Sequence, residues 1–108
     1  MKMFLTIIGL FLSTICFSQI QVIQFNAGWN ESNSVTWLPK LSDCKVGQID
    51  IAKNKDAQSK YKIVVVPTII IFNNGDEVKR YQANIMMQIE AKLEDVQHVV
   101  DETVMESF

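Results

Sequence analysis

The stretch Ile20–Asn33 reads IQVIQFNAGWNESN: an apolar, β-branched run followed by a glycine, a tryptophan and two asparagines. An apolar run of this length without clean alternation predicts a central strand, covered on both faces, that reaches Ala27. Gly28 marks the turn that ends the strand. Because asparagine is a favoured N-cap, Asn30 predicts the start of a helix that continues to about Leu41.

A second stretch, Tyr61–Gly75, reads YKIVVVPTIIIFNNG. Its nearly continuous isoleucine and valine residues predict a buried strand over Ile63–Phe72. Pro67 cannot donate a ladder hydrogen bond, so it is expected at the first position of the strand. The sequence Asn73–Asp76 favours a hairpin turn. The more polar Glu77–Ala83 then predicts an antiparallel return strand at an edge of the sheet.

Three further segments complete the expected order. Cys44–Ala52 predicts a strand, and Asp56–Tyr61 predicts one or two helical turns. Asn84 is the expected N-cap of a last helix that runs to about Met105 on one apolar stripe: Ile85, Ile89, Leu93, Val96 and Val100. The predicted order is therefore β-α-β-(α)-β-β-α. The helix-linked first strands are expected to pair in parallel and the last two strands as a hairpin.

The N-terminus predicts a secretion signal. Lys2 precedes fifteen uncharged residues, Met3–Phe17, and small or polar residues follow at Ser18 and Gln19. This pattern predicts a signal peptide over residues 1–18, cleaved before Gln19, and an exported domain over residues 19–108 in the periplasm or outside the cell. The alternative is an uncleaved signal that anchors the protein, although the run is short for a span of about 20 residues.

The composition restricts the function further. A net charge of −2 with 20% charged residues argues against a nucleic-acid partner. Lys53, Lys55, Lys60 and Lys62 form the most basic segment, which could be an anion-binding patch. A solvated helix face is the favoured interpretation, because acidic residues lie among these lysines. No glycine-rich phosphate loop and no metal-ligand spacing is present, so we expect no cofactor and no metal.

The two quoted stretches resemble the two halves of a thioredoxin active site. In that family a strand ending F-x-A-x-W leads into C-x-x-C, and here Phe25, Ala27 and Trp29 match the strand. The two cysteine positions are occupied by Asn30 and Asn33. The resemblance covers most of residues 20–101. It implies a thioredoxin-like three-layer α/β fold with a mixed four-stranded sheet.

The resemblance also implies that the dithiol chemistry of the family is lost. Asparagine has no ionisable proton, so Asn30 and Asn33 cannot act as thiols. Gln24 stands where the family places a buried acid, and Asn26 stands where an aromatic residue often shields the site. Four positions have changed together, which predicts a redox-inactive member.

What remains is a peptide groove beside Pro67, whose bond the resemblance implies to be cis. The predicted function is an exported protein- or peptide-binding or accessory module whose partner is an extended polypeptide or an envelope protein. Its predicted binding residues are Trp29, Asn30, Asn33, Val66, Pro67 and Thr68. For the cis turn itself a purely structural role is the favoured interpretation, because Val65 stands at a position that is often glycine in the family and Ala83 replaces a glycine of the facing loop, so both side chains are expected to crowd the groove.

Cys44 is the only cysteine that remains after signal cleavage, so an internal disulfide is excluded in the mature domain. An inert, partly buried thiol is the favoured interpretation. The alternatives are a divergent thiol-disulfide oxidoreductase that acts through Cys44 and a Cys44-linked dimer. His98 is expected on the solvated face of the last helix.

Overall fold

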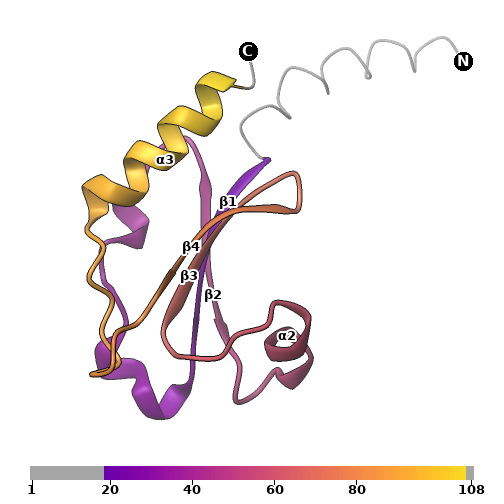
Figure 1. Cartoon of the computed structure of the whole chain (residues 1–108), viewed down its shortest axis with the longest axis vertical. Coiled ribbons are helices and arrows are strands. Elements are labelled where there is room, and N and C mark those ends of the chain that lie inside the picture. Colours follow the sequence, from indigo (N-terminus) through magenta and orange to yellow (C-terminus); the bar gives the residue numbers. More distant parts are fainter. Residues whose placement is uncertain (1–18, 107–108) are drawn as a thin grey trace, which may run out of the picture.

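The computed structural model describes residues 19–106, so the predicted signal peptide and Cys16 lie outside the described residues. Four strands form one sheet in the order β2-β1-β3-β4 (Figure 1). Their bounds are β1 Ile20–Asn26, β2 Lys45–Asp50, β3 Thr68–Asn73 and β4 Asp76–Gln82. The predicted mixed sheet and the thioredoxin-like α/β fold are confirmed.

The pairing of the strands corrects one expectation. β1 pairs with β2 in parallel, as predicted, but β1 pairs with β3 antiparallel, with Phe25 opposite Thr68 and Ile20 opposite Asn73. The reason is that the connection from β2 to β3, which contains only the short helix α2 (Lys55–Lys60), passes β1 at one end of the sheet and does not run back along the length of the strands. β3 therefore starts at the end of the sheet where β1 and β2 finish.

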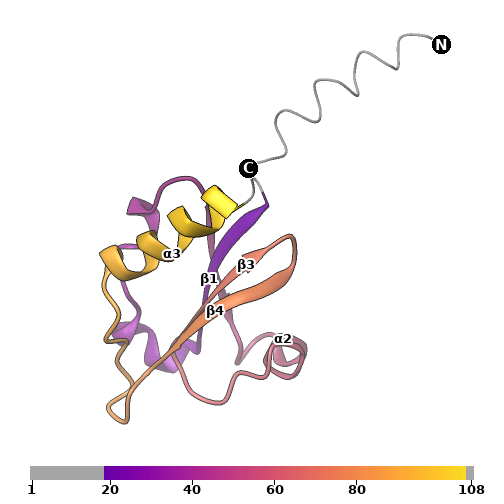
Figure 2. The ribbon, with the colours of Figure 1, turned by 45° about the horizontal axis from the view of Figure 1, so that its top comes forward.

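The sheet has a separate hydrophobic cluster on each face, because successive side chains of a strand point to opposite faces. On one face α3 (Leu93–Glu106) packs on a cluster around Val22, Ile69 and Ile71. On the other face, a cluster around Phe25 and Ile70 continues to Ile63 and Tyr61, which follow α2. Figures 1 and 2 show α3 and α2 on opposite sides of the sheet in both views.

The predicted helix over Asn30–Leu41 is wrong. The chain instead forms two short 3₁₀ helices, η1 (Gly28–Asn33) and η2 (Leu38–Lys40), with an extended residue, Ser34, after the first. Ser32 and Ser34 compete with the backbone for hydrogen bonds, and the proline at position 39 removes a further donor, so the segment has little helical preference. Asn30 lies inside η1 and does not cap a helix.

The last helix also begins later than predicted. α3 starts at Leu93, and Asn84 caps a turn instead: its Oδ1 accepts from the backbone N–H groups of Met86 (2.9 Å) and Gln88 (3.1 Å). Ile85, expected on the buried stripe, is 96% exposed.

The predicted strand over Ile63–Phe72 is only half formed. Regular strand structure starts after Pro67, and Val64 in the preceding loop is 76% exposed. The hairpin turn is confirmed, with Asn74 and Gly75 at positive φ (58° and 88°), and β4 lies at the edge of the sheet. Within residues 19–106, no helix has the length and apolar character needed to cross a membrane.

Candidate functional site

The predicted site residues meet at one end of the sheet. β1 and β2 finish there and β3 begins there, so η1 and the loop before β3 lie next to each other. The side-chain amide of Asn30 donates to the backbone oxygen of Val66 across this junction (3.4 Å). The structure therefore brings together the two stretches on which the sequence analysis depended.

Asn26, the last residue of β1, is the centre of a buried amide network. Its Nδ2 donates to Ser34 Oγ (2.8 Å) and to the backbone oxygen of Asn30 (3.1 Å). Its Oδ1 accepts from the N–H of Ala27 (2.9 Å) and from Asn30 Nδ2 (3.1 Å). All the hydrogen-bonding capacity of a buried amide is used, as stability requires.

Asn30 and Asn33 belong to the same network. Asn33 Nδ2 donates to Asn30 Oδ1 (2.8 Å), and the side-chain nitrogen of Asn30 is already engaged by Asn26 and Val66. Asn30 is only 5% exposed. The side chains at the two positions that carry thiols in C-x-x-C sequences are thus hydrogen-bonded to each other. Both are neutral amides, which have no redox chemistry.

Gln24, which lies two residues before Asn26 on β1, is completely buried. Its Oε1 accepts from the N–H of Val35 (2.9 Å), which attaches the segment after η1 to the sheet. Its Nε2 has no hydrogen-bond partner among the described residues. A side-chain amide does not titrate near neutral pH, so Gln24 cannot supply a proton to the junction above it.

The loop before β3 carries the other predicted residues. The Val66–Pro67 bond is cis, and Thr68 Oγ1 donates to the backbone oxygen of Val65 (2.7 Å). Val66, Pro67 and Thr68 are all buried. Of the six predicted binding residues, only Trp29 is largely exposed, at 69%.

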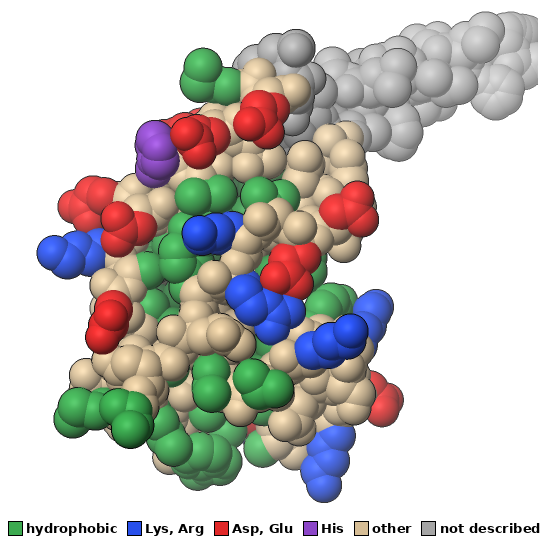
Figure 3. All heavy atoms as spheres, viewed as in Figure 1, with side chains coloured by type: hydrophobic (Ala, Val, Ile, Leu, Met, Phe, Trp, Pro, Cys, Tyr) green, Lys and Arg blue, Asp and Glu red, His purple; other side chains and the backbone are tan. Residues whose placement is uncertain are grey.

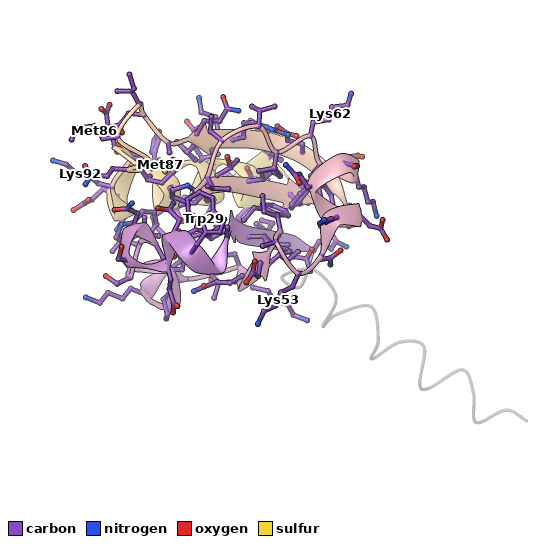
Figure 4. All side chains as sticks on the ribbon, turned by 90° about the horizontal axis from the view of Figure 1, so that it is seen from below. Trp29, Lys53, Lys62, Met86, Met87 and Lys92 are labelled. Carbon is purple, nitrogen blue, oxygen red and sulfur yellow. The ribbon has the colours of Figure 1, made fainter. Side chains whose placement is uncertain are left out.

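Trp29 borders an apolar groove with a volume of about 360 Å³. The groove runs between η1, the loop before β3 and the turn after β4. Figure 4 shows Trp29 on this end of the molecule, with Met86 and Met87 on one side of it. The lining residues are Trp29, Ile51, Gln58, Ile63, Val64, Val65, Val66, Asn84, Ile85 and Met87. Several of these apolar side chains are strongly exposed, which is unusual for a surface with no binding role.

The family model named Thioredoxin matches residues 11–95. The chain belongs to the thioredoxin family. No curated protein sequence matches it.

Solved thioredoxins share the fold at low sequence identity. A thioredoxin variant from Halobacterium salinarum is 22% identical over 79% of this chain and 74% of its own, with a TM-score of 0.58. Thioredoxin-2 of the malaria parasite, described as a component of protein secretion machinery, is 21% identical over 78% of this chain and 82% of its own, with a TM-score of 0.62. Fasciola hepatica thioredoxin is 19% identical over 88% and 86%, with a TM-score of 0.52.

Most of the residues that line the groove of this thioredoxin-family domain were not predicted from the sequence. Ile85 and Met87 were expected within a helix, and Val64 within a buried strand. One signal could have identified the turn after β4: Met86 and Met87 lie side by side, whereas one face of a helix takes apolar residues three or four apart.

A clamp from β4 fixes the wall of the groove that precedes β3. Arg80 donates to the backbone oxygens of Tyr61 (2.8 Å) and Lys62 (3.1 Å). It also makes a two-pronged ion pair with Glu77 (2.7 and 2.8 Å), which lowers the pKa of that carboxyl mainly through the hydrogen bond from Arg80. Lys62 is held at a φ of 53°, a conformation that non-glycine residues rarely adopt.

Cys44 lies away from this site. It precedes β2, at the opposite end of the sheet from Asn30, and packs beside the α3 cluster. Burial, followed by the charges of Asp43 and Asp101, raises the pKa of the thiol to about 11. A thiol with so high a pKa is protonated at neutral pH and is a poor nucleophile.

His98 is exposed on α3 and lies 3.2 Å from Glu102, as expected for a solvated helix residue. Among residues 19–106, no group of three or more histidine, cysteine or acidic side chains is arranged to hold a metal ion.

Proposed function

We propose that this thioredoxin-family domain is exported and binds extended polypeptide without dithiol chemistry. The observation that carries the proposal is the contrast at one end of the sheet. The positions that would carry the thiols are closed into a buried amide network, while the groove next to them is apolar and open.

The backbone of the groove wall supports an extended ligand. Within the described residues, the hydrogen bonds of residues 64–66 are those accepted by the oxygens of Val65 and Val66. The N–H groups of residues 64–66 have no hydrogen-bond partner within residues 19–106. A peptide in extended conformation can use such groups by adding itself as a strand, while its side chains enter the apolar groove.

Loss of redox chemistry is supported by the residues themselves. Asn30, Asn33 and Gln24 provide neither a thiolate nor a titrating acid, and the remaining thiol, Cys44, has a raised pKa and lies at the other end of the sheet. No observation favours an oxidoreductase that acts through Cys44, so we propose no second function.

The test uses protein purified from an exporting host. Binding of a short peptide with a valine and leucine core is measured through tryptophan fluorescence in a Trp37→Phe background, so that Trp29 reports alone. We expect saturable binding that Met87→Ser weakens and that Met105→Ser leaves unchanged. Met105 is a matched control, since it is an exposed methionine on α3, far from the groove. Equal weakening by both variants, or none by either, would contradict the proposal.

The redox part is tested separately by insulin reduction, with an ordinary thioredoxin as the positive control. We expect no turnover above background. Turnover that Cys44→Ser abolishes would move the active site to Cys44.

Export is tested by the intact mass of the same preparation. The expected chain begins at Gln19, because Lys2 and the uncharged run to Phe17 have the pattern of a cleaved signal. A mass that retains Met1 in the envelope fraction would replace cleavage with anchoring.

A further inference from the structure

The charges of this domain are unevenly distributed around the groove. Residues 19–106 contain nine lysines and arginines against twelve acidic residues, so the domain is acidic. The segment 51–66, which forms one wall of the groove, has the opposite sign, with four lysines against a single aspartate. In Figure 3 the lysines gather beside α2, next to the apolar end of the molecule, while acidic side chains are concentrated along α3.

Within residues 19–106, the lysines of this wall form no ion pair with an acidic side chain. The ion pairs among the described residues are Arg80–Glu77 and His98–Glu102, and neither involves this segment. The ammonium group of Lys60 lies over the ring of Tyr61, at 5.2 Å from its centre. The charges of Lys53, Lys55 and Lys62 remain available to a carboxylate from outside.

Two of the acidic side chains near the groove, those of Glu90 and Asp50, accept local hydrogen bonds. Glu90 Oε2 accepts from the side-chain nitrogen of Asn84 (2.9 Å), and Asp50 Oδ1 accepts from the N–H of Ala52 (2.9 Å). Glu31 lines a separate polar pocket that it shares with Asp50. These bonds draw the carboxylates toward the protein, whereas the lysine heads extend into solvent.

The position of the lysines follows from the fold. Figure 4 shows Lys53 and Lys62 on one side of Trp29, and Lys92 on the other side with Met86 and Met87. Lys62 is fixed by the Arg80 clamp on its backbone oxygen. An extended ligand lying across Trp29 therefore has Lys53 and Lys62 on one side, and on the other side Lys92, whose neighbours in the sequence include Glu90 and Glu94.

We propose that the groove selects an extended peptide with an apolar core flanked by aspartate or glutamate residues. The inference rests on the proposed function and specifies its ligand. Charge complementarity provides the selectivity, and the apolar core provides the affinity. A peptide is favoured over an anionic membrane surface because the apolar residues line a concave groove with unpaired backbone N–H groups, which a strand fills and a lipid surface does not.

The experiment compares three peptides that share one valine and leucine core and carry glutamate, glutamine or lysine at both ends. We expect the glutamate peptide to bind about tenfold more tightly than the lysine peptide at low salt, since several exposed charge pairs contribute additively. The ratio should fall toward about twofold near 1 M salt, where the Debye length is short. The variant Lys53→Glu/Lys62→Glu should reverse the order of the glutamate and lysine peptides.

The control variant Lys40→Glu/Lys79→Glu changes the net charge equally but lies at η2 and on β4, so the order of the peptides should be retained. If all three peptides bind equally and without salt dependence, the charge inference is overturned while peptide binding stands. If no peptide binds, the proposed function itself fails. If anionic phosphatidylserine vesicles bind instead, and the Lys53→Glu/Lys62→Glu variant abolishes that binding, the surface faces a membrane and the inference is wrong.

Discussion

The buried amide network and the apolar groove are neighbours, yet they differ in hydrogen bonding and in exposure. In the network, Asn26 and Asn30 satisfy their hydrogen-bonding groups with each other and with the backbone. In the groove, Trp29 and Ile85 expose most of their apolar surface, at 69% and 96%. A buried network whose hydrogen bonds are all made stabilises a fold, whereas an exposed apolar surface is typical of a binding site. Under the proposed function, catalysis and recognition in this fold depend on separable groups of residues, and this chain has lost the first while it keeps the second.

The largest effect should come from breaking the network. Asn26→Ala leaves buried groups on Ala27, Asn30 and Ser34 without partners, so we expect a loss of about 2–4 kcal/mol in the free energy of unfolding. Urea denaturation measures it. Gln21→Ala, an exposed change on the same strand, should stay within about 0.5 kcal/mol. Equal stability of the two variants would show that the network is not structural.

A second prediction concerns Cys44, which lies outside both regions. With its pKa raised to about 11, Cys44 should react with a neutral alkylating agent at pH 8 about a hundredfold more slowly than in the urea-unfolded chain. The sign of the pH dependence follows. As pH rises from the ordinary thiol range toward 11, the unfolded chain releases this proton first, so the free energy of unfolding should decrease. A labelling rate that is unchanged by urea would contradict the burial.

The third prediction addresses the groove. Trp29→Ala should weaken binding of the glutamate-flanked peptide by about thirtyfold, because tryptophan is a frequent anchor of binding interfaces. Its exposed side chain contributes little to the fold, so the free energy of unfolding should change by less than about 0.5 kcal/mol. Isothermal titration calorimetry and urea denaturation measure the two effects. A loss of stability equal to that of Asn26→Ala would contradict the prediction, because Trp29 would then stabilise the fold as the amide network does.

The smallest effect concerns the clamp on the groove wall. Glu77→Gln should lower the free energy of unfolding at pH 7 by less than about 1 kcal/mol, since the ion pair with Arg80 is partly exposed. The lowered pKa of Glu77 means that this contribution is present above the ordinary glutamate range and is lost as pH falls through the lowered value. The variant and the wild type should therefore converge in acid. Glu106→Gln, at the end of α3, serves as the control for removal of one negative charge.

The sequence predicts those parts of the fold that depend on local preference. The isoleucine run of β3 and the turn Asn73–Asp76 have few alternatives, and both form as expected. The prediction of a helix over Asn30–Leu41 failed because an asparagine side chain can form the hydrogen bonds of a helix cap, of a turn or of a tertiary contact. One of the bonds of Asn30 joins it to Val66, thirty-six residues away, and a local sequence pattern does not contain such a partner.

The groove could be predicted only in part for the same reason. Trp29 and the cis proline were predicted from the motif residues around them. Ile85 and Val64 lie in loops, because α3 and β3 begin later than the apolar pattern indicates. The wall lysines are exposed, as predicted. Their position beside the groove depends on the path of the chain from β2 to β3 across one end of the sheet.

The central claim is that recognition persists where catalysis has been replaced by a structural network. A titration of ¹⁵N-labelled protein with the glutamate-flanked peptide, followed by NMR, tests it most directly. The account predicts shifts of the Trp29 indole and of the backbone amides of Val64, Val65, Ile85 and Met87, while the side-chain amides of Asn26 and Asn30 stay in place. Shifts centred on Cys44, or movement of the buried side-chain amides without any change at Trp29, would contradict it.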